Sequence, residues 1–198
     1  DDMPEPQGVN VRNKEIEELP WGGKFAFYWC IVGGAIDNRY ATAIKKGIMQ
    51  SMTEGPLTGS NCQNIRVCIY DGKMHAVDSN DISFQLAASH AFKEAFNEAR
   101  PQLLEPYYQL EVLCEDAYTG DVMGDLQTRR AIIQGMDTDG HYQKIISEVP
   151  LAELKDYGST LRSLTQGKAK FKLEFSNYQL VPTHVQESLV ISNAVLSE

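Results

Sequence analysis

The sequence lacks a long apolar run, a metal-binding cysteine pattern and a nucleotide-binding loop. No stretch approaches the roughly 20 apolar residues of a membrane-spanning helix, and the first residues do not form a basic-then-apolar secretion signal. The four cysteines include no CxxC pair, and the G-x-x-x-x-G-K-S/T and G-x-G-x-x-G patterns are absent. These absences argue against a membrane protein, a zinc finger and a nucleotide site within this chain. Unpaired cysteines in apolar runs favour a reduced, cytoplasmic compartment.

Basic residues are also scarce. The 198 residues contain 18 Lys and Arg against 27 Asp and Glu, which gives a formal net charge of −9. Taken alone, this charge argues against nucleic acid, because phosphates attract clustered cations. The acids are unevenly placed, however: residues 1–20 hold six acids and two bases, whereas residues 21–106 hold eight of each. The net charge therefore does not exclude a local contact with RNA.

The first half of the chain is predicted to be an α+β unit. Residues 1–24 are interrupted by Pro and Gly and are expected to be an acidic insertion or linker, with the opening strand of the sheet missing before Asp1. Residues 25–32 are apolar at alternate and intervening positions, which predicts a strand buried on both faces. Residues 38–54 have the apolar period of a helix, and residues 65–70 are predicted to form a second strand. Asp71-Gly72 predicts a hairpin with a return strand at residues 74–77. A helix over residues 80–99 is expected to bury Ile82, Leu86, Phe92 and Phe96.

The second half is predicted to have the order β-α-β-β-α-β. Two prolines at positions 101 and 106 mark the boundary, so the expected domains are residues 1–106 and 107–198. Strands are predicted at residues 107–114, 131–136, 141–149 and 168–178, and helices at residues 120–130 and 151–165. This order is the ferredoxin-like plan. A further helix is expected after Pro182.

One group of candidate site residues follows the first strand, and another lies in the predicted hairpin. Gly33 and Gly34 resemble a phosphate-binding turn in placement only, and an ordinary left-handed turn beside a solvated arginine is the alternative. If both loops reach the same end of one sheet, Asn38, Arg39 and His75 converge on one edge.

His75 and Asp78 allow three interpretations. They could act as a base and its orienting carboxylate in a hydrolase, although no nucleophile motif accompanies them. Asp78 or Ser79 could instead cap the following helix and leave His75 exposed. In the third interpretation the imidazole contacts phosphates or bases.

A basic strip is predicted on the last strand of the second half. Lys168, Lys170 and Lys172 fall on one face of this strand, and Arg162 on the preceding helix is expected to extend the strip. The strip permits contact with ribosomal RNA, and solvated lysines that keep the sheet soluble are the alternative. Residues 120–125 lack the spacing of a calcium loop, so no metal ligands are predicted.

These segments resemble the C-terminal two domains, IV and V, of the elongation factor G family of ribosomal translocases. The resemblance covers residues 25–182. The matching stretches in the first half are Ile31-Val32-Gly33-Gly34, Glu54-Gly55-Pro56-Leu57-Thr58-Gly59, residues 75–78, residues 86–96 and Leu104-Glu105-Pro106. Those in the second half are residues 120–126, 148–153 and 161–167.

The resemblance implies a fragment of a translation factor without a catalytic residue of its own. It implies a ribosomal-protein-S5-like fold for domain IV, whose tip enters the small-subunit decoding centre and contacts transfer RNA and messenger RNA. The tip residues that it implies are Gly33, Gly34, Ala35, Ile36, His75 and Asp78. Domain V is expected to lie near the large-subunit factor-binding site, and GTP and Mg²⁺ are expected in an N-terminal GTPase domain outside this chain. A cytoplasmic monomer is expected.

The sequence departs from the family at position 37, where relatives usually have proline after the Gly-Gly turn. Asp37 loses the fixed φ of proline and adds an anion. A ribosome-protection or rescue paralogue of the same superfamily therefore stays open as an alternative to the translocase. So does an interaction domain that makes no contact with RNA.

Overall fold

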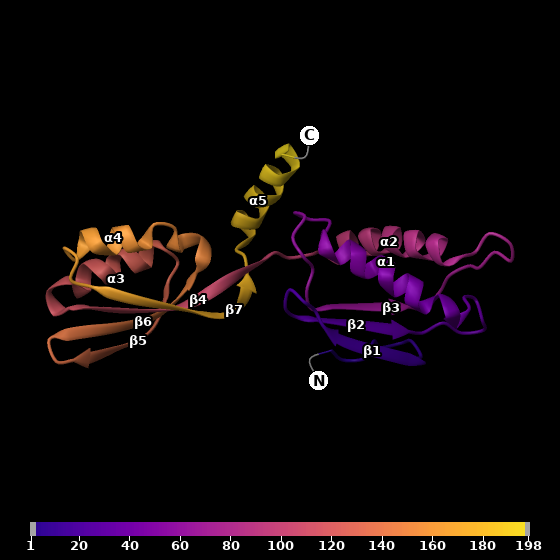
Figure 1. The fold of residues 1–198 in the computed structure, drawn as a ribbon, viewed down its shortest axis with the longest axis horizontal. Coiled ribbons are helices and arrows are strands. Elements are labelled where there is room, and N and C mark those ends of the chain that lie inside the picture. The colour runs from indigo at the N-terminus through magenta and orange to yellow at the C-terminus, as the bar shows by residue number, and fades with distance from the viewer. Residues whose placement is uncertain (1–2, 197–198) are drawn as a thin grey trace. The chain divides into compact units, whose positions relative to one another are not determined.

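The structure, a computed structural model, describes residues 3–196, which form two compact units (Figure 1). The first unit contains residues 3–101 together with residues 187–196, and the second contains residues 102–186. Helix α5 (Thr183–Leu196) follows, as the sequence predicts. In the part of the chain that is described, no helix has the length and apolar character needed to cross a bilayer.

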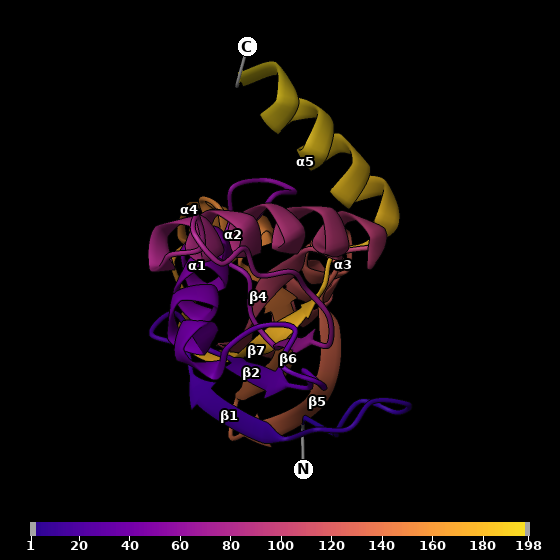
Figure 2. The same cartoon turned by 90° about the vertical axis from the view of Figure 1, so that its right-hand side faces the viewer.

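The first unit has a three-stranded sheet covered on one face by two helices (Figures 1 and 2). The sheet order is β1 (Asn13–Glu18), β2 (Lys24–Trp29) and β3 (Ile65–Ile69), with β1 antiparallel and β3 parallel to β2. A short 3-10 helix η1 (Asn38–Tyr40) leads into α1 (Ala41–Thr53), and α2 (Asp81–Glu98) follows β3.

Strand β2 is buried on both faces, which confirms the prediction. Phe25, Phe27 and Trp29 join the core beneath α1 and α2. The alternate side chains, including Tyr28 and Cys30, lie on the other face, where Met3, Val9 and Val11 cover them. The Tyr28 hydroxyl donates to the Met3 carbonyl oxygen at 2.8 Å. The described N-terminal residues are therefore part of the fold.

The prediction that residues 1–24 form an insertion and that the opening strand is missing is wrong for residues 13–18, which form β1. The side chains of β1 are almost all exposed and mostly charged, so the strand shows no apolar alternation. Such a composition is typical of an edge strand. Lys45 of α1 holds it by contacts with Glu15 and Glu17 at 2.7 and 3.2 Å. Residues 1 and 2 lie outside the described residues.

Two further predictions for the first unit are wrong. Residues 70–80 form a loop with a turn at residues 76–78 in place of the expected return strand, and the Asp71 side chain accepts from the Gly72 amide at 2.7 Å. The buried face of α2 consists of Phe84, Ala88 and Phe92. Of the residues expected to be buried, Phe92 is buried and Phe96 packs against the core, whereas Ile82 and Leu86 are exposed. The helix takes this rotation because it approaches α1 closely: a Cβ built at Gly47 would lie 2.1 Å from the Gln85 carbonyl oxygen.

The second unit confirms the ferredoxin-like prediction, and with it the α+β fold class. Its elements are β4 (Leu104–Glu115), η2 (Asp116–Tyr118), α3 (Thr119–Thr128), β5 (Ile132–Asp139), β6 (Tyr142–Pro150), η3 (Leu151–Leu154), α4 (Tyr157–Leu164) and β7 (Lys170–Leu180). The antiparallel sheet has the order β5-β6-β4-β7, and Leu110, Val112 and Ile145 pack against Leu126 and Leu161 of the helices.

Two boundaries in the second unit differ from the prediction. The expected domain boundary after Pro106 falls inside β4, where Pro106 lies opposite Tyr178, and the units divide after Pro101. The expected helix over residues 151–165 is interrupted before α4, because Asp156 has a left-handed φ of 58°.

Candidate functional site

Two loops leave the carboxyl end of the sheet in the first unit side by side. Because β2 and β3 are parallel, both chains emerge at the same edge, and the Cys30 amide donates to the Ile69 carbonyl oxygen at 2.8 Å just beyond the strands. We call residues 31–40 the first tip loop and residues 70–80 the second tip loop. The structure thus brings the loops that carry Arg39 and His75 together, as the sequence predicts.

The first tip loop begins with an exposed double-glycine turn. Gly33 and Gly34 have φ values of 70° and 76°, which side chains other than glycine rarely adopt. Ala35 is half-buried, whereas Ile36 is only 6% exposed and packs into the core. Ile36 therefore anchors the loop in the core, and its expected contact with transfer RNA or messenger RNA stays a prediction.

Asp37 and Arg39 interact at the turn into α1. The Asp37 carboxylate accepts from the Arg39 amide at 3.0 Å and lies 3.7 Å from the Arg39 Nε. The guanidinium also donates from Nη2 to the Tyr40 hydroxyl at 2.9 Å and lies 4.7 Å from the centre of the Tyr40 ring. Asn38 and Arg39 are both exposed. The Asp37 carboxylate therefore keeps the Arg39 side chain close to the turn into α1.

The second tip loop carries an exposed His75–Asp78 pair. The His75 Nδ1 lies 3.0 Å from the Asp78 Oδ2, and the two side chains are 71% and 79% exposed. The His75 amide donates to the Ser79 Oγ at 2.8 Å, and the Ser79 amide donates back to the His75 carbonyl oxygen at 3.3 Å. Asn80 caps α2 and forms a capping box with Ser83. Ser79 thus orders the loop, while Asn80 is the residue that caps the helix.

The contacts of His75 are made with Ser79 and Asp78 of the same loop. Ser79 carries the hydroxyl nearest to His75 in the sequence, and this hydroxyl accepts from the His75 backbone amide. The imidazole Nδ1 faces the Asp78 carboxylate. A hydrolytic site needs a nucleophile, a base and an oxyanion donor in one cleft. The open position of His75 suits contact with an external molecule.

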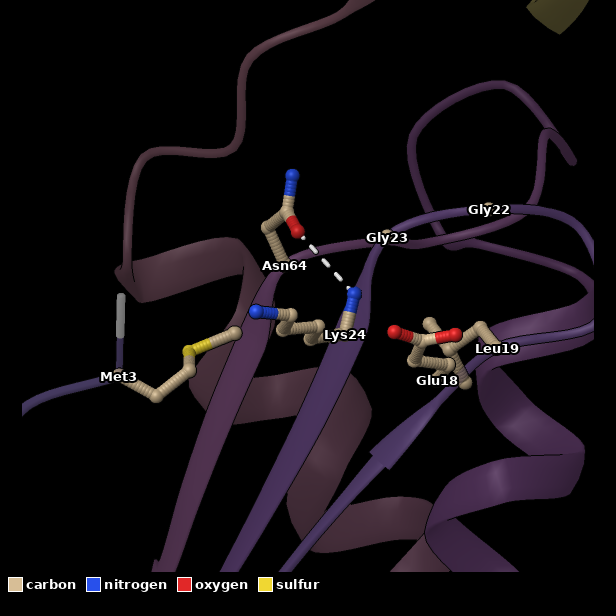
Figure 3. A pocket seen from close by; sticks show the side chains of 7 residues that line it. All are labelled: Met3, Glu18, Leu19, Gly22, Gly23, Lys24 and Asn64. Carbon is tan, nitrogen blue, oxygen red and sulfur yellow. Dashed lines mark hydrogen bonds between the residues drawn. The ribbon is translucent and has the colours of Figure 1, made fainter. Parts of the chain in front are cut away.

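The pocket shown in Figure 3 lies at the opposite end of the sheet from the tip. Its volume is about 650 Å³, and Met3, Glu18, Leu19, Lys24 and Asn64 line it with two glycines. The Lys24 amide donates to the Asn64 Oδ1 at 3.1 Å (Figure 3). None of the predicted site residues lines this pocket.

The first tip loop differs from a loop that binds the phosphates of a nucleotide. The double-glycine turn leads into the three-residue helix η1, and the Asp37 carboxylate already takes the Arg39 amide that a phosphate would need. No group of three His, Cys, Asp or Glu side chains arranged for a metal is found among the described residues.

The charges of the tip are mixed. Arg39, Lys73 and His75 stand beside exposed acids, namely Asp37, Asp71, Asp78 and Asp81. Three exposed apolar side chains accompany them in the second tip loop: Tyr70 at 69%, Met74 at 40% and Val77 at 85%. Because acids and bases alternate on this surface, recognition of a partner would depend on its shape and on individual contacts more than on a net positive charge.

The predicted basic strip of the second unit is divided between two faces. Phe171 contacts Tyr157 of α4 at 5.4 Å between ring centres, so it points toward the helices and its neighbours Lys170 and Lys172 point away from them. Arg162 belongs to α4 and lies on the helix side. Lys168 and Lys172 also lie 3.2 Å from Glu115 and Glu174. Contact of this strip with ribosomal RNA stays a prediction.

Sequence reasoning misses two residues that join the tip loops. The spacing of Tyr40 predicts only a place in a helical stripe, but its hydroxyl donates to the Ser79 carbonyl oxygen of the other loop at 3.0 Å. Gly72 is predicted to form a hairpin turn, but it lies against Ile36. Both contacts depend on how the loops approach each other in space, and no short-range pattern encodes that.

Comparison with known proteins gives matches over nearly the whole chain. The family model described as elongation factor G, domain IV, matches residues 12–100, and that described as elongation factor G C-terminus matches residues 102–189. The first match includes β1, so this strand belongs to the family's domain IV.

Individual relatives also carry the name elongation factor G. The chain is 45% identical over 176 residues to an elongation factor G of Aquifex pyrophilus and 42% identical over 177 residues to that of Thermotoga neapolitana. These alignments cover 89% and 88% of this chain but 25% and 26% of the relatives, so the chain spans about a quarter of their length. A crystal structure of a protein from Thermus thermophilus matches with a TM-score of 0.76 and 39% identity, over 91% of this chain and 29% of that one.

Proposed function

Because the chain belongs to the elongation factor G family, we propose that it is the ribosome-contacting end of a translation factor that drives GTP-dependent translocation of transfer RNA and messenger RNA. The two tip loops enter the decoding centre of the small subunit, and the second unit lies near the factor-binding site of the large subunit. GTP and Mg²⁺ bind a GTPase domain outside the present sequence. The factor works as a cytoplasmic monomer.

The observation that carries this proposal is the paired, exposed geometry of the tip. Two loops emerge from parallel strands at one edge, lock together through buried Ile36 and Tyr40, and present Arg39 and His75 outward. A rigid protrusion with a few placed donors suits a structured RNA surface, where shape and hydrogen bonds to phosphates, sugars and bases dominate recognition. Gly33 and Gly34 near the start of the first tip loop have no side chain, which allows close approach to an RNA backbone.

Ribosome binding under varied salt tests the RNA contact. In co-sedimentation of the full-length factor with ribosomes, Arg39→Gln is expected to weaken binding and to reduce the slope of log affinity against log salt by about 1, the effect of one lost phosphate contact. Lys93→Gln is the matched control, because Lys93 is an exposed cation on α2. Equal slopes for the two variants would contradict the contact at Arg39.

Asp37 supports a second candidate, a ribosome-protection or rescue factor of the same superfamily. The residue has a φ of −68°, which is the value that proline fixes, so the backbone at this position already has a φ that suits proline. What differs is the carboxylate, which holds Arg39. This local pairing distinguishes the tip from that of a relative with proline.

Asp37→Pro separates the two candidates. Proline fits the φ of this position but removes the carboxylate that caps η1. Because these two effects oppose each other, the free energy of unfolding is expected to change by no more than about 1 kcal/mol. A standard translocase tolerates the family residue and keeps its translocation rate. Loss of translocation with an unchanged melting temperature would favour the specialised paralogue.

A further inference from the structure

We infer that Tyr40 is a positioning residue of the tip, whose hydroxyl couples the two tip loops and fixes Arg39 and His75 relative to each other. The inference rests on the proposed contact of the tip with RNA. Tyr40 is buried and contacts no external molecule itself. Its role is to position the exposed side chains of Arg39 and His75.

The coupling is a chain of hydrogen bonds from one loop to the other. The Arg39 Nη2 donates to the Tyr40 oxygen at 2.9 Å, and the Tyr40 hydroxyl donates to the Ser79 carbonyl oxygen at 3.0 Å. Ser79 in turn accepts from the His75 amide through Oγ at 2.8 Å. The phenol thus acts as both an acceptor and a donor, the two hydrogen-bonding roles open to the group.

The Tyr40 ring is held firmly enough to act as a fixed point. Its side chain is 4% exposed, and its ring stacks on Phe84 with 4.4 Å between centres and 27° between planes. Because the stack joins η1 to α2, the hydroxyl stands at a set position between the core and the loops. A hydrogen bond from such a rigid group restricts its partners more than one from a mobile surface side chain.

Each loop has its own side-chain pair, and Tyr40 connects the two. Arg39 is paired with Asp37 in the first loop, and His75 with Asp78 in the second. The exposed pairs alone are weak restraints, since such contacts typically contribute little to stability. The Tyr40–Ser79 bond is part-buried and links loops 39 residues apart in sequence. The distance between Arg39 and His75 therefore depends on this bond.

The test is Tyr40→Phe in the full-length factor, read by hydrogen exchange and by translocation. Phenylalanine keeps the stack on Phe84 and removes only the hydroxyl. Exchange in peptides covering residues 74–80 is expected to become roughly three- to tenfold faster, the range for one lost intramolecular hydrogen bond. Ser79→Ala, which removes the acceptor of the His75 amide, is expected to act in the same direction.

Tyr28→Phe is the matched control. Tyr28 is also a buried tyrosine of this unit, but its hydroxyl donates to the Met3 carbonyl oxygen on the other face of the sheet. This variant is expected to leave exchange over residues 74–80 and the translocation rate unchanged. A general loosening of the unit would affect both variants alike and would overturn the specific role of Tyr40.

Translocation adds a readout that a purely structural tyrosine would not move. Tyr40→Phe is expected to slow translocation several-fold, about as much as Arg39→Ala, and the double variant is expected to be no slower than the slower single one. Unchanged exchange over residues 74–80 in Tyr40→Phe overturns the inference. Faster exchange with normal translocation overturns the positioning role. If Arg39→Ala and His75→Ala also translocate at the normal rate, the proposed function is contradicted. If these two variants translocate slowly, only the positioning role of Tyr40 is contradicted.

Discussion

Ile36 and Gly72 lie so close that a Cβ built at Gly72 would be 2.3 Å from the Ile36 Cδ1. The contact joins the base of the first tip loop to the second, and Ile36 is buried at this point. Glycine is therefore needed at position 72 for close approach, since its φ lies outside the left-handed region. The contact and the Tyr40–Ser79 hydrogen bond hold the same two loops.

Gly72→Ala is predicted to lower the free energy of unfolding by about 1 kcal/mol, because the added methyl group forces Ile36 to move in a filled core. Ile36→Val removes the Cδ1 and makes room. In a chain that carries Ile36→Val, Gly72→Ala is expected to lower the free energy of unfolding by at most about half as much as in the original chain. Urea denaturation of the original chain, the two single variants and the double variant measures this coupling. Additive effects would contradict the contact.

Gly47→Ala is predicted to be the more damaging glycine substitution. The new Cβ would lie 2.1 Å from the Gln85 carbonyl oxygen, so α1 and α2 must separate, with a loss of about 3 kcal/mol of unfolding free energy. Gly124→Ala is the control, because Gly124 lies inside α3 with nothing within 4 Å of its Cβ position. It is expected to be neutral or to stabilise by about 0.5–1 kcal/mol. Equal losses in thermal denaturation would rule out the close helix approach.

The sequence predicts the elements whose side chains are apolar and periodic. Strand β2 and the order of the second unit could be predicted because their patterns reflect burial. Strand β1 could not, because its pairing with β2 is a matter of backbone hydrogen bonds and its side chains face solvent. The rotation of α2 depends on Gly47 and Phe84, and Ile82 and Leu86 supply an equally apolar but exposed stripe.

The site is predictable in its location but not in its connections. Parallel strands bring the loops of Arg39 and His75 to one edge, and the spacing of the elements indicates that. The pairing of Arg39 with Asp37 and the bond from Tyr40 to Ser79 arise from side-chain geometry in three dimensions. The sequence also does not determine the face on which Arg162 lies, because a helix packed on a sheet can present its cations on either side.

Cys62 is predicted to make the stability of the chain sensitive to alkaline pH. Burial raises the pKa of the Cys62 thiol to about 11 from its ordinary value of 9.0. Because the folded state favours the protonated thiol, its contribution is complete below pH 9 and is lost as the pH rises toward 11. In urea denaturation at about pH 8 and about pH 11, the fall in unfolding free energy is expected to be smaller for Cys62→Ala than for the unmodified chain. A fall of the same size in both would show that the thiol does not contribute.

The most direct test of the proposed function is single-turnover translocation by the full-length factor carrying His75→Ala. His75 is exposed at the tip, so its loss is expected to leave folding and GTP hydrolysis unchanged. Translocation is expected to slow by roughly tenfold, the effect of about 1.4 kcal/mol of lost transition-state stabilisation. His90→Ala, an exposed histidine on α2, is the control and is expected to translocate at the normal rate. A normal rate for His75→Ala as well would contradict the assignment of the tip.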